Sequence, residues 1–158
     1  GLIGSTTDVG NGTYTATFTG QASGTATTIT ALINGVSVST TLPTVVVNTG
    51  PISVTQSQVS VSASTVASGS SVTVTLTARD SFGNPITTGG ETIAFARSGG
   101  TSTGTFSPAS DQLDGTYIAS FQGLIAGTAT TVTATINGST VTSTMPTITV
   151  TPGPISLS

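Results

Sequence analysis

Hydrophobic and polar residues alternate along much of the chain with a period of two. A clear stretch has an apolar residue at every second position, with serine or threonine between: Val72, Val74, Leu76 and Ala78. Such alternation places successive side chains on opposite faces of a β-strand, one face buried and the other in water. No window of ten or more residues has the spacing of an amphipathic helix. The pattern therefore predicts an all-β protein.

Turn-forming residues divide the alternating runs into about seven strands. The turns are Asp80 to Pro85, Ser98-Gly99-Gly100 and Asn137-Gly138, and Asn-Gly is the strongest short hairpin signal. The outward positions are mostly threonine, whose branched side chain favours strands and offers a hydroxyl to water. The expected strands are 52–62 (broken), 71–79, 91–97, 103–107, 115–122, 127–137 and 139–151. Two sheets packed face to face would bury their apolar sides.

A repeat of 103 residues organises these strands. Residues 11–55 align with 114–158 without a gap, and 25 of the 45 pairs are identical. The repeat length is close to the ~100 residues of an immunoglobulin-like sandwich. The boundaries fall at Gly50-Pro51 and Gly153-Pro154, because proline fixes φ and blocks strand pairing. We therefore expect tandem immunoglobulin-like antiparallel β-sandwiches.

These boundaries divide the chain into three pieces. Residues 51–153 would be a complete module, 1–50 the C-terminal half of a preceding module, and 154–158 the first strand of a following one. The half module would leave its inward apolar side chains in water: Tyr14, Ala16, Phe18, Ile29, Ala31, Ile33 and Val38. Two completions stay open. Either the polypeptide continues upstream as a long array, which the size of the deficit favours, or neighbouring subunits exchange strands.

Composition restricts the chemistry of the protein. Only 4% of the residues are charged, against about 25% in an ordinary domain, and the chain has two Arg, five acidic residues and no Lys, His or Cys. The lack of a basic patch argues against nucleic-acid binding. The lack of Cys and His argues against zinc, haem and iron–sulfur cofactors, and against thiol or imidazole catalysis. We expect no cofactor and no enzymatic activity.

The surface chemistry points to an extracellular location. The 37 Thr and 22 Ser occupy positions where cytosolic domains carry Lys and Glu for solubility. No run approaches the ~18 apolar residues of a membrane-spanning helix. With so few titratable groups, stability is expected to change little between about pH 4 and 9.

Two pairs of polar residues are weak candidate sites. Asp111 and Asp114 lie three residues apart in a loop, and calcium takes several oxygen ligands. Neither an EF-hand-like run nor a second carboxylate cluster accompanies them, so loop capping is the favoured interpretation. Asn11 and Asn137 each begin an N-glycosylation acceptor triplet, yet both lie at expected Asn-Gly turns, which again is the favoured interpretation.

Two further polar residues have expected structural roles. Asp80 is expected to hydrogen-bond its own turn, as aspartate does at the start of turns. Glu91 is expected to be a solvated residue at the entrance of a strand.

Several motifs together are similar to a known family. They are Val72-Thr73-Val74-Thr75-Leu76-Thr77-Ala78-Arg79-Asp80, then Gly83-Asn84-Pro85, then Thr92-Ile93-Ala94-Phe95, and a second half running from Gly115-Thr116-Tyr117 to Ile136-Asn137-Gly138. This order resembles the bacterial immunoglobulin-like domains of invasin and intimin, and the second half also resembles the filamin-type repeat. The resemblance implies a tandem stalk that holds an adhesive tip away from a bacterial surface. The low charge is a departure from the family.

The leading hypothesis is a non-enzymatic stalk or fibre segment of a repetitive extracellular protein of the bacterial cell surface. Its expected partners are neighbouring immunoglobulin-like modules, of the same array or of adjacent subunits, while a tip outside this sequence binds a host or cell-surface ligand. Two alternatives stay open. One is a filament subunit completed by strand exchange between neighbours, and the other is a module that binds a host protein or glycan through its loops.

Overall fold

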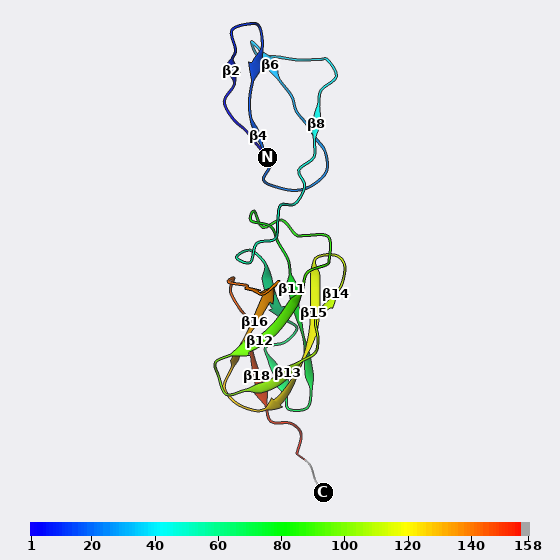
Figure 1. Ribbon diagram of the computed structural model, residues 1–158, viewed down its shortest axis with the longest axis vertical. Helices are drawn as coiled ribbons and strands as arrows, with labels where there is room; N and C mark the ends of the chain where they lie inside the picture. Colours follow the sequence, from blue (N-terminus) through cyan, green and yellow to red (C-terminus); the bar gives the residue numbers. More distant parts are fainter. Residues whose placement is uncertain (156–158) are drawn as a thin grey trace. The chain divides into compact units, whose positions relative to one another are not determined.

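The computed structural model describes residues 1–155 and divides the chain into two compact units, Gly1–Gly50 and Pro51 onward (Figure 1). Every regular element over 1–155 is a β-strand, which confirms the predicted all-β class. No helix in this range is long and apolar enough to cross a membrane. The two units are described separately, and their assignment as half module and complete module stays a prediction.

The second unit consists of two five-stranded sheets. The first has the order β13 (Thr103–Phe106), β15 (Thr116–Ile125), β11 (Ser71–Thr77) and β9 (Gln58–Val61), with β14 (Ser110–Asp111) also on β15. The second has the order β10 (Thr65–Ala67), β18 (Thr147–Thr151), β16 (Thr130–Ile136) and β12 (Ile93–Ser98), with β17 (Ser139–Thr140) also on β16. All these pairs are antiparallel except β10 with β18, which is parallel.

The core of the second unit lies between the inward faces of its two sheets. Along β11 and β16 every second side chain is buried, as the alternation predicts. The largest fully buried apolar side chains are Tyr117, Phe121, Leu76, Ile148, Val74, Val132 and Val150. The rings of Phe106 and Phe121 pack with centroids 4.9 Å apart. The two-sheet sandwich expected from the sequence is therefore the observed fold.

Strand boundaries differ from the expectation in a few places. The segment 52–57 forms a turn and one isolated bridge from Ile52 to Asp80, and strand pairing begins at β9. The expected strand 139–151 is interrupted between β17 and β18, in the part that contains Pro146. Short β10 and β14 had no expected counterpart. The predicted strand 154–158 falls mostly on 156–158, which lie outside the described residues.

The first unit consists of eight two-residue strands in four antiparallel pairs. The pairs are β1 (Leu2–Ile3) with β4 (Phe18–Thr19), β2 (Thr7–Asp8) with β3 (Tyr14–Thr15), β5 (Thr27–Thr28) with β8 (Thr44–Val45), and β6 (Leu32–Ile33) with β7 (Val36–Ser37). Every side chain of this unit is exposed or half-buried. The first unit therefore has strands and turns but no fully buried core residue.

Candidate functional site

An open apolar hollow is the main surface feature of the first unit. Its volume is about 930 Å³, and its walls include Ile3, Tyr14, Ala16, Ile29, Ala31 and Ile33. Tyr14 is 64% exposed and Ile33 68% exposed. Exposed apolar patches of this kind mark interaction surfaces. The hollow contains most of the inward set expected from the sequence, and it lies uncovered within 1–50.

The loop after β11 is organised by the Asp80 carboxylate. Asp80 is 1% exposed, and its Oδ1 accepts hydrogen bonds from Phe82 N and Asn84 N, both at 2.9 Å. Its Oδ2 accepts a third bond from Asn84 Nδ2 at 2.9 Å. Arg79 Nη1 donates to Gly83 O at 2.8 Å in the same loop. The prediction that Asp80 binds its own turn is confirmed, and this buried carboxylate has a structural role.

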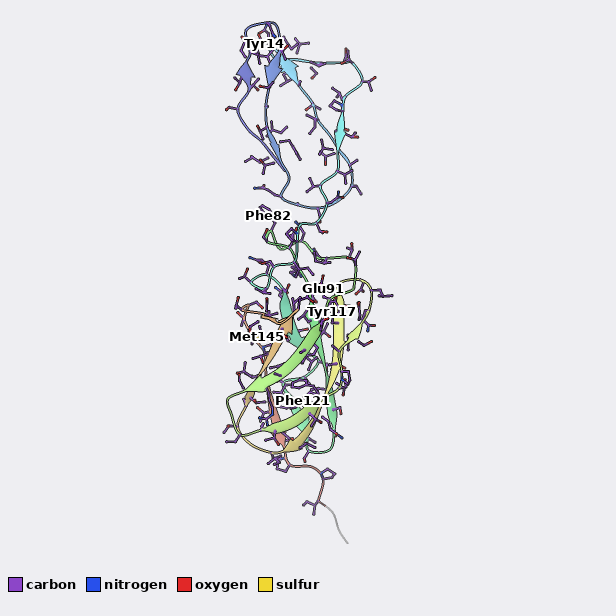
Figure 2. All side chains as sticks on the ribbon, in the orientation of Figure 1. Tyr14, Phe82, Glu91, Tyr117, Phe121 and Met145 are labelled. Atoms are coloured by element: carbon purple, nitrogen blue, oxygen red, sulfur yellow. The ribbon has the colours of Figure 1, made fainter. Side chains whose placement is uncertain are left out.

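A second polar cluster joins the start of β12 to the β16–β17 hairpin. Asn137 lies in the left-handed region with φ 49°, and its side chain binds both the Glu91 carboxylate, through Nδ2, and Thr92 N, through Oδ1. Glu91 N in turn donates to the Tyr117 hydroxyl at 3.1 Å. Figure 2 shows Glu91 and Tyr117 close together in this unit. Glu91 is half-buried just before β12, at the entrance of the strand as expected, and the hairpin places an amide beside its carboxylate that the sequence did not predict.

Tyr117 is buried within this cluster at 1% exposure. Burial raises the pKa of its phenol above the ordinary value of 10.0, because a phenolate would lose its hydration. The neighbouring carboxylates of Asp111 and Glu91 act in the same direction, while the bond from Glu91 N acts against it. Tyr117 is therefore a neutral structural residue over the whole physiological range.

The carboxylates of the calcium candidates Asp111 and Asp114 accept hydrogen bonds from neighbouring loop residues, and Asp111 also accepts one from the loop of Gly90. Asp111 Oδ1 accepts from Leu113 N at 2.8 Å and Oδ2 from Gly90 N at 2.7 Å. Asp114 Oδ1 accepts from the Thr116 hydroxyl at 2.6 Å and from Thr116 N at 2.9 Å, and these bonds lower its pKa below 3.8. The described residues include no group of three or more acidic, His or Cys side chains that could hold a metal ion. The contacts fit loop capping, and the calcium site stays a prediction.

The two glycosylation candidates lie in turns. Asn11 Oδ1 accepts from Thr13 N at 3.1 Å, and the Asn137 side chain makes the bonds to Glu91 and Thr92 described above. Asn34 and Asn137, which occupy equivalent positions in the repeat, have φ of 51° and 49°. This conformation suits asparagine before glycine in a hairpin. Glycosylation of Asn11 and Asn137 stays a prediction.

The geometry defines the class of protein, and comparison with known proteins defines its family. Two mainly antiparallel sheets packed over an apolar core are the architecture of an immunoglobulin-like module. The family described as invasin, domain 3, matches residues 53–153, and the chain belongs to this family. The resemblance to invasin-type domains expected from the sequence is confirmed.

Solved structures of bacterial adhesins are similar to the chain. FdeC, an Escherichia coli adhesin, is 31% identical over 98% of this chain with a TM-score of 0.61, and InvD of Yersinia pseudotuberculosis is 25% identical over 97% with a TM-score of 0.56. Invasin, a bacterial integrin-binding protein, shares the fold with a TM-score of 0.57 at 22% identity over 90% of this chain. These matches cover 49%, 45% and 28% of the respective chains, so the chain spans about half their length or less. None of the curated proteins matches the chain.

Proposed function

We propose that the chain is a non-enzymatic spacer segment of a repetitive adhesin at the bacterial cell surface. The observation that carries this proposal is the path of the polypeptide through the second unit. The chain enters this unit at one end and leaves it at the opposite end (Figure 1). A module of this kind adds its own length to an array. The relatives described as adhesins, rather than as enzymes, support the same function.

Each end of the module is held by a backbone hydrogen bond. At entry, Ser53 N donates to Arg79 O at 2.7 Å. At exit, Ser68 N donates to Thr151 O at 2.8 Å, beside the parallel β10–β18 pair. A pulling force on Pro51 and Gly153 would therefore meet a backbone hydrogen bond beside the Ile52–Asp80 bridge at entry and bonded strands at exit. This arrangement suits a segment that transmits force.

Solution scattering tests the spacer function. We would compare the full chain with chains that carry one or two further copies of 51–153 after Gly153. If the modules are spacers, each copy lengthens the particle by a constant increment and leaves its cross-section unchanged. A compact or freely jointed particle would contradict the proposal.

The proposed partners are neighbouring modules, and ligand binding is assigned to a tip outside this sequence. Host cells incubated with the labelled full chain should therefore show no saturable binding. Saturable binding that is lost when loop residues such as Phe82, which is 62% exposed, are replaced would favour the loop-based binding module instead.

A further inference from the structure

The first unit repeats the backbone of residues 104–153, pair by pair. With a shift of 103 residues, β1–β4 corresponds to β13–β15, β2–β3 to β14–β15, β5–β8 to β16–β18 and β6–β7 to β16–β17. Five hydrogen bonds outside the strands recur with equivalent partners: Gly4 N–Thr17 O and Ser107 N–Ser120 O, Val9 N–Thr13 O and Gln112 N–Thr116 O, Gly24 N–Val47 O and Gly127 N–Val150 O, Ile29 N–Pro43 O and Val132 N–Pro146 O, Val38 N–Ala31 O and Val141 N–Ala134 O. The first unit is thus the same half of a sandwich.

The resemblance extends to the packing of one glycine. A side chain at Gly1 would collide with the Phe18 ring, and one at the equivalent Gly104 would collide with the Phe121 ring. In each unit, the backbone at this glycine lies close to the equivalent phenylalanine ring. Gly1 is therefore the equivalent of Gly104, the residue that directly follows Thr103 in the second unit.

In the second unit, strands from residues 51–103 cover this half. β11 pairs along β15 with Leu76 opposite Tyr117, and β12 pairs along β16 with Phe95 opposite Ala134. β9 extends the first sheet beyond β11, and β10 lies beside β18 in the second sheet. These four strands supply the inward side chains that bury Tyr117, Phe121 and Ile136.

Within 1–50, all of which the structure describes, no strand takes the places of β9 to β12. The consequence is visible at equivalent side chains. Tyr14 is 64% exposed and Tyr117 1%, while Ile33 is 68% exposed and Ile136 4%. The hollow of about 930 Å³ lies between the strand pairs where the second unit has its core.

The two copies agree in sequence where the covering strands pack. The four buried positions of β15 are identical in the first unit: Tyr14 and Tyr117, Ala16 and Ala119, Phe18 and Phe121, Gly20 and Gly123. The three intervening positions all differ: Thr15 and Ile118, Thr17 and Ser120, Thr19 and Gln122. The buried face of β15, the strand along which β11 pairs, is thus repeated residue for residue in the first unit. On the strand that corresponds to β16, Ala31 and Ile33 match Ala134 and Ile136, and Ile29 takes the place of Val132.

We propose that this open face binds a segment of the 51–103 type that is joined directly to Gly1, as Thr103 is joined to Gly104. Its strands would lie as β11 does beside β15, β12 beside β16 and β10 beside β18. A second copy of this chain is a poorer occupant, because its own 51–103 segment is already paired with its 104–153. The proposal is independent of the spacer function, since any role of the module needs a complete sandwich.

The test extends the full chain by a copy of residues 51–103 placed directly before Gly1. Tyr14 and Tyr117 are the only tyrosines of the natural 158 residues, so nitration with mass-spectrometric mapping reports both units at once. In the unextended chain, Tyr14 should react and Tyr117 should not. In the extended chain, we expect Tyr14 to fall to the low reactivity of Tyr117, and amides around Ala16 and Ala31 to gain protection from hydrogen exchange.

A matched control separates strand docking from simple lengthening. In it, the added copy carries Val74→Asp and Leu76→Asp, which remove the apolar face that would pack on Tyr14 and Phe18. Tyr14 should then stay reactive while Tyr117 of the natural module stays protected. Equal Tyr14 reactivity in all three chains would overturn the proposal. Protection of Tyr14 in the unextended chain would also overturn the proposal. If that protection appears only at high protein concentration, the occupant of the open face is a second copy of the chain. A compact particle in the scattering experiment would overturn the spacer function and leave this result unchanged.

Discussion

Residues 1–50 and 104–153 have nearly the same sequence pattern and the same turns, yet their side chains differ in exposure. Phe121 is fully buried, whereas its equivalent Phe18 is half-buried. The difference does not come from local sequence, because the inward residues equivalent to Tyr117, Ala119 and Phe121 are identical. It comes from β9 to β12, which lie over one copy only. Burial in this protein is therefore a property of strand partners that are distant in sequence, and stability should follow those partners.

The largest expected effect is the loss of a core ring. Phe121→Ala should destabilise the second unit by about 3–5 kcal/mol, because it leaves a cavity in a closed core beside Phe106. Phe18→Ala, the same change at the equivalent position, should leave the unfolding transition of the second unit in place. Equilibrium urea unfolding of the full chain, followed by NMR signals of each unit, measures both. Equal shifts for the two variants would contradict the comparison.

The next effect concerns buried polar groups. Asp80→Ala should cost the second unit about 1–3 kcal/mol, because it leaves Phe82 N and Asn84 N without their buried acceptor. The matched variant is Asp8→Ala in the first unit, where the exposed carboxylate accepts from Gly10 N at 2.8 Å. Water can replace that exposed acceptor, so Asp8→Ala should change the free energy of unfolding of the first unit by about a few tenths of a kcal/mol at most. A smaller loss for Asp80→Ala than for Asp8→Ala would show that burial does not set the cost.

A smaller effect is expected at the repeated tyrosine. Tyr117→Phe should cost about 1 kcal/mol, because the hydroxyl that accepts from Glu91 N is removed inside the module. Tyr14→Phe serves as the control, since the Tyr14 side chain is mostly exposed. Thermal unfolding of both variants beside the natural chain measures the difference. An equal change in both would mean that the bond to Glu91 contributes nothing.

These residues also show what can be predicted from sequence. Alternation predicts β11, β15 and β16, because each strand has one face in the core and one in water. The role of Asp80 is predictable because its hydrogen-bond partners lie within four residues of it in the sequence. β10 is three residues long and joins its sheet through a parallel pairing with β18, so no local pattern marks it. No local pattern marks the hydrogen bond of Glu91 either. Its partner Asn137 is 46 residues away and becomes adjacent only when β12 pairs with β16.

The open face of the first unit likewise depends on contacts between residues that are distant in sequence. The sequence lets one identify its inward residues, because the repeat aligns them with a buried set. It does not give their exposure, which depends on whether a covering segment is paired with them. The hollow is therefore a candidate site that only the structure reveals, although its apolar wall residues Tyr14, Ala16, Ile29, Ala31 and Ile33 stand in alternating patterns.

The smallest expected effect is that of pH, and it again separates the two tyrosines. Since only seven side chains carry charge, the melting temperature of the second unit should move little between about pH 4 and 9. Above the ordinary phenol value of 10.0, the unfolded chain loses the Tyr117 proton while the folded chain retains it, because burial raises the folded pKa. The unfolded state then binds fewer protons, so stability falls as pH rises.

On the acid side, the bonds from Thr116 lower the pKa of Asp114 in the folded chain. The stabilisation by the ionised Asp114 is therefore present above the ordinary pKa of 3.8 and is lost as pH falls through the lowered folded pKa. Calorimetry extended beyond both ends of this range should show a plateau with a fall on the alkaline side and a fall on the acid side. Tyr117→Phe should remove the alkaline fall and Tyr14→Phe should not, so an alkaline fall that persists in Tyr117→Phe would assign the pH dependence to another group.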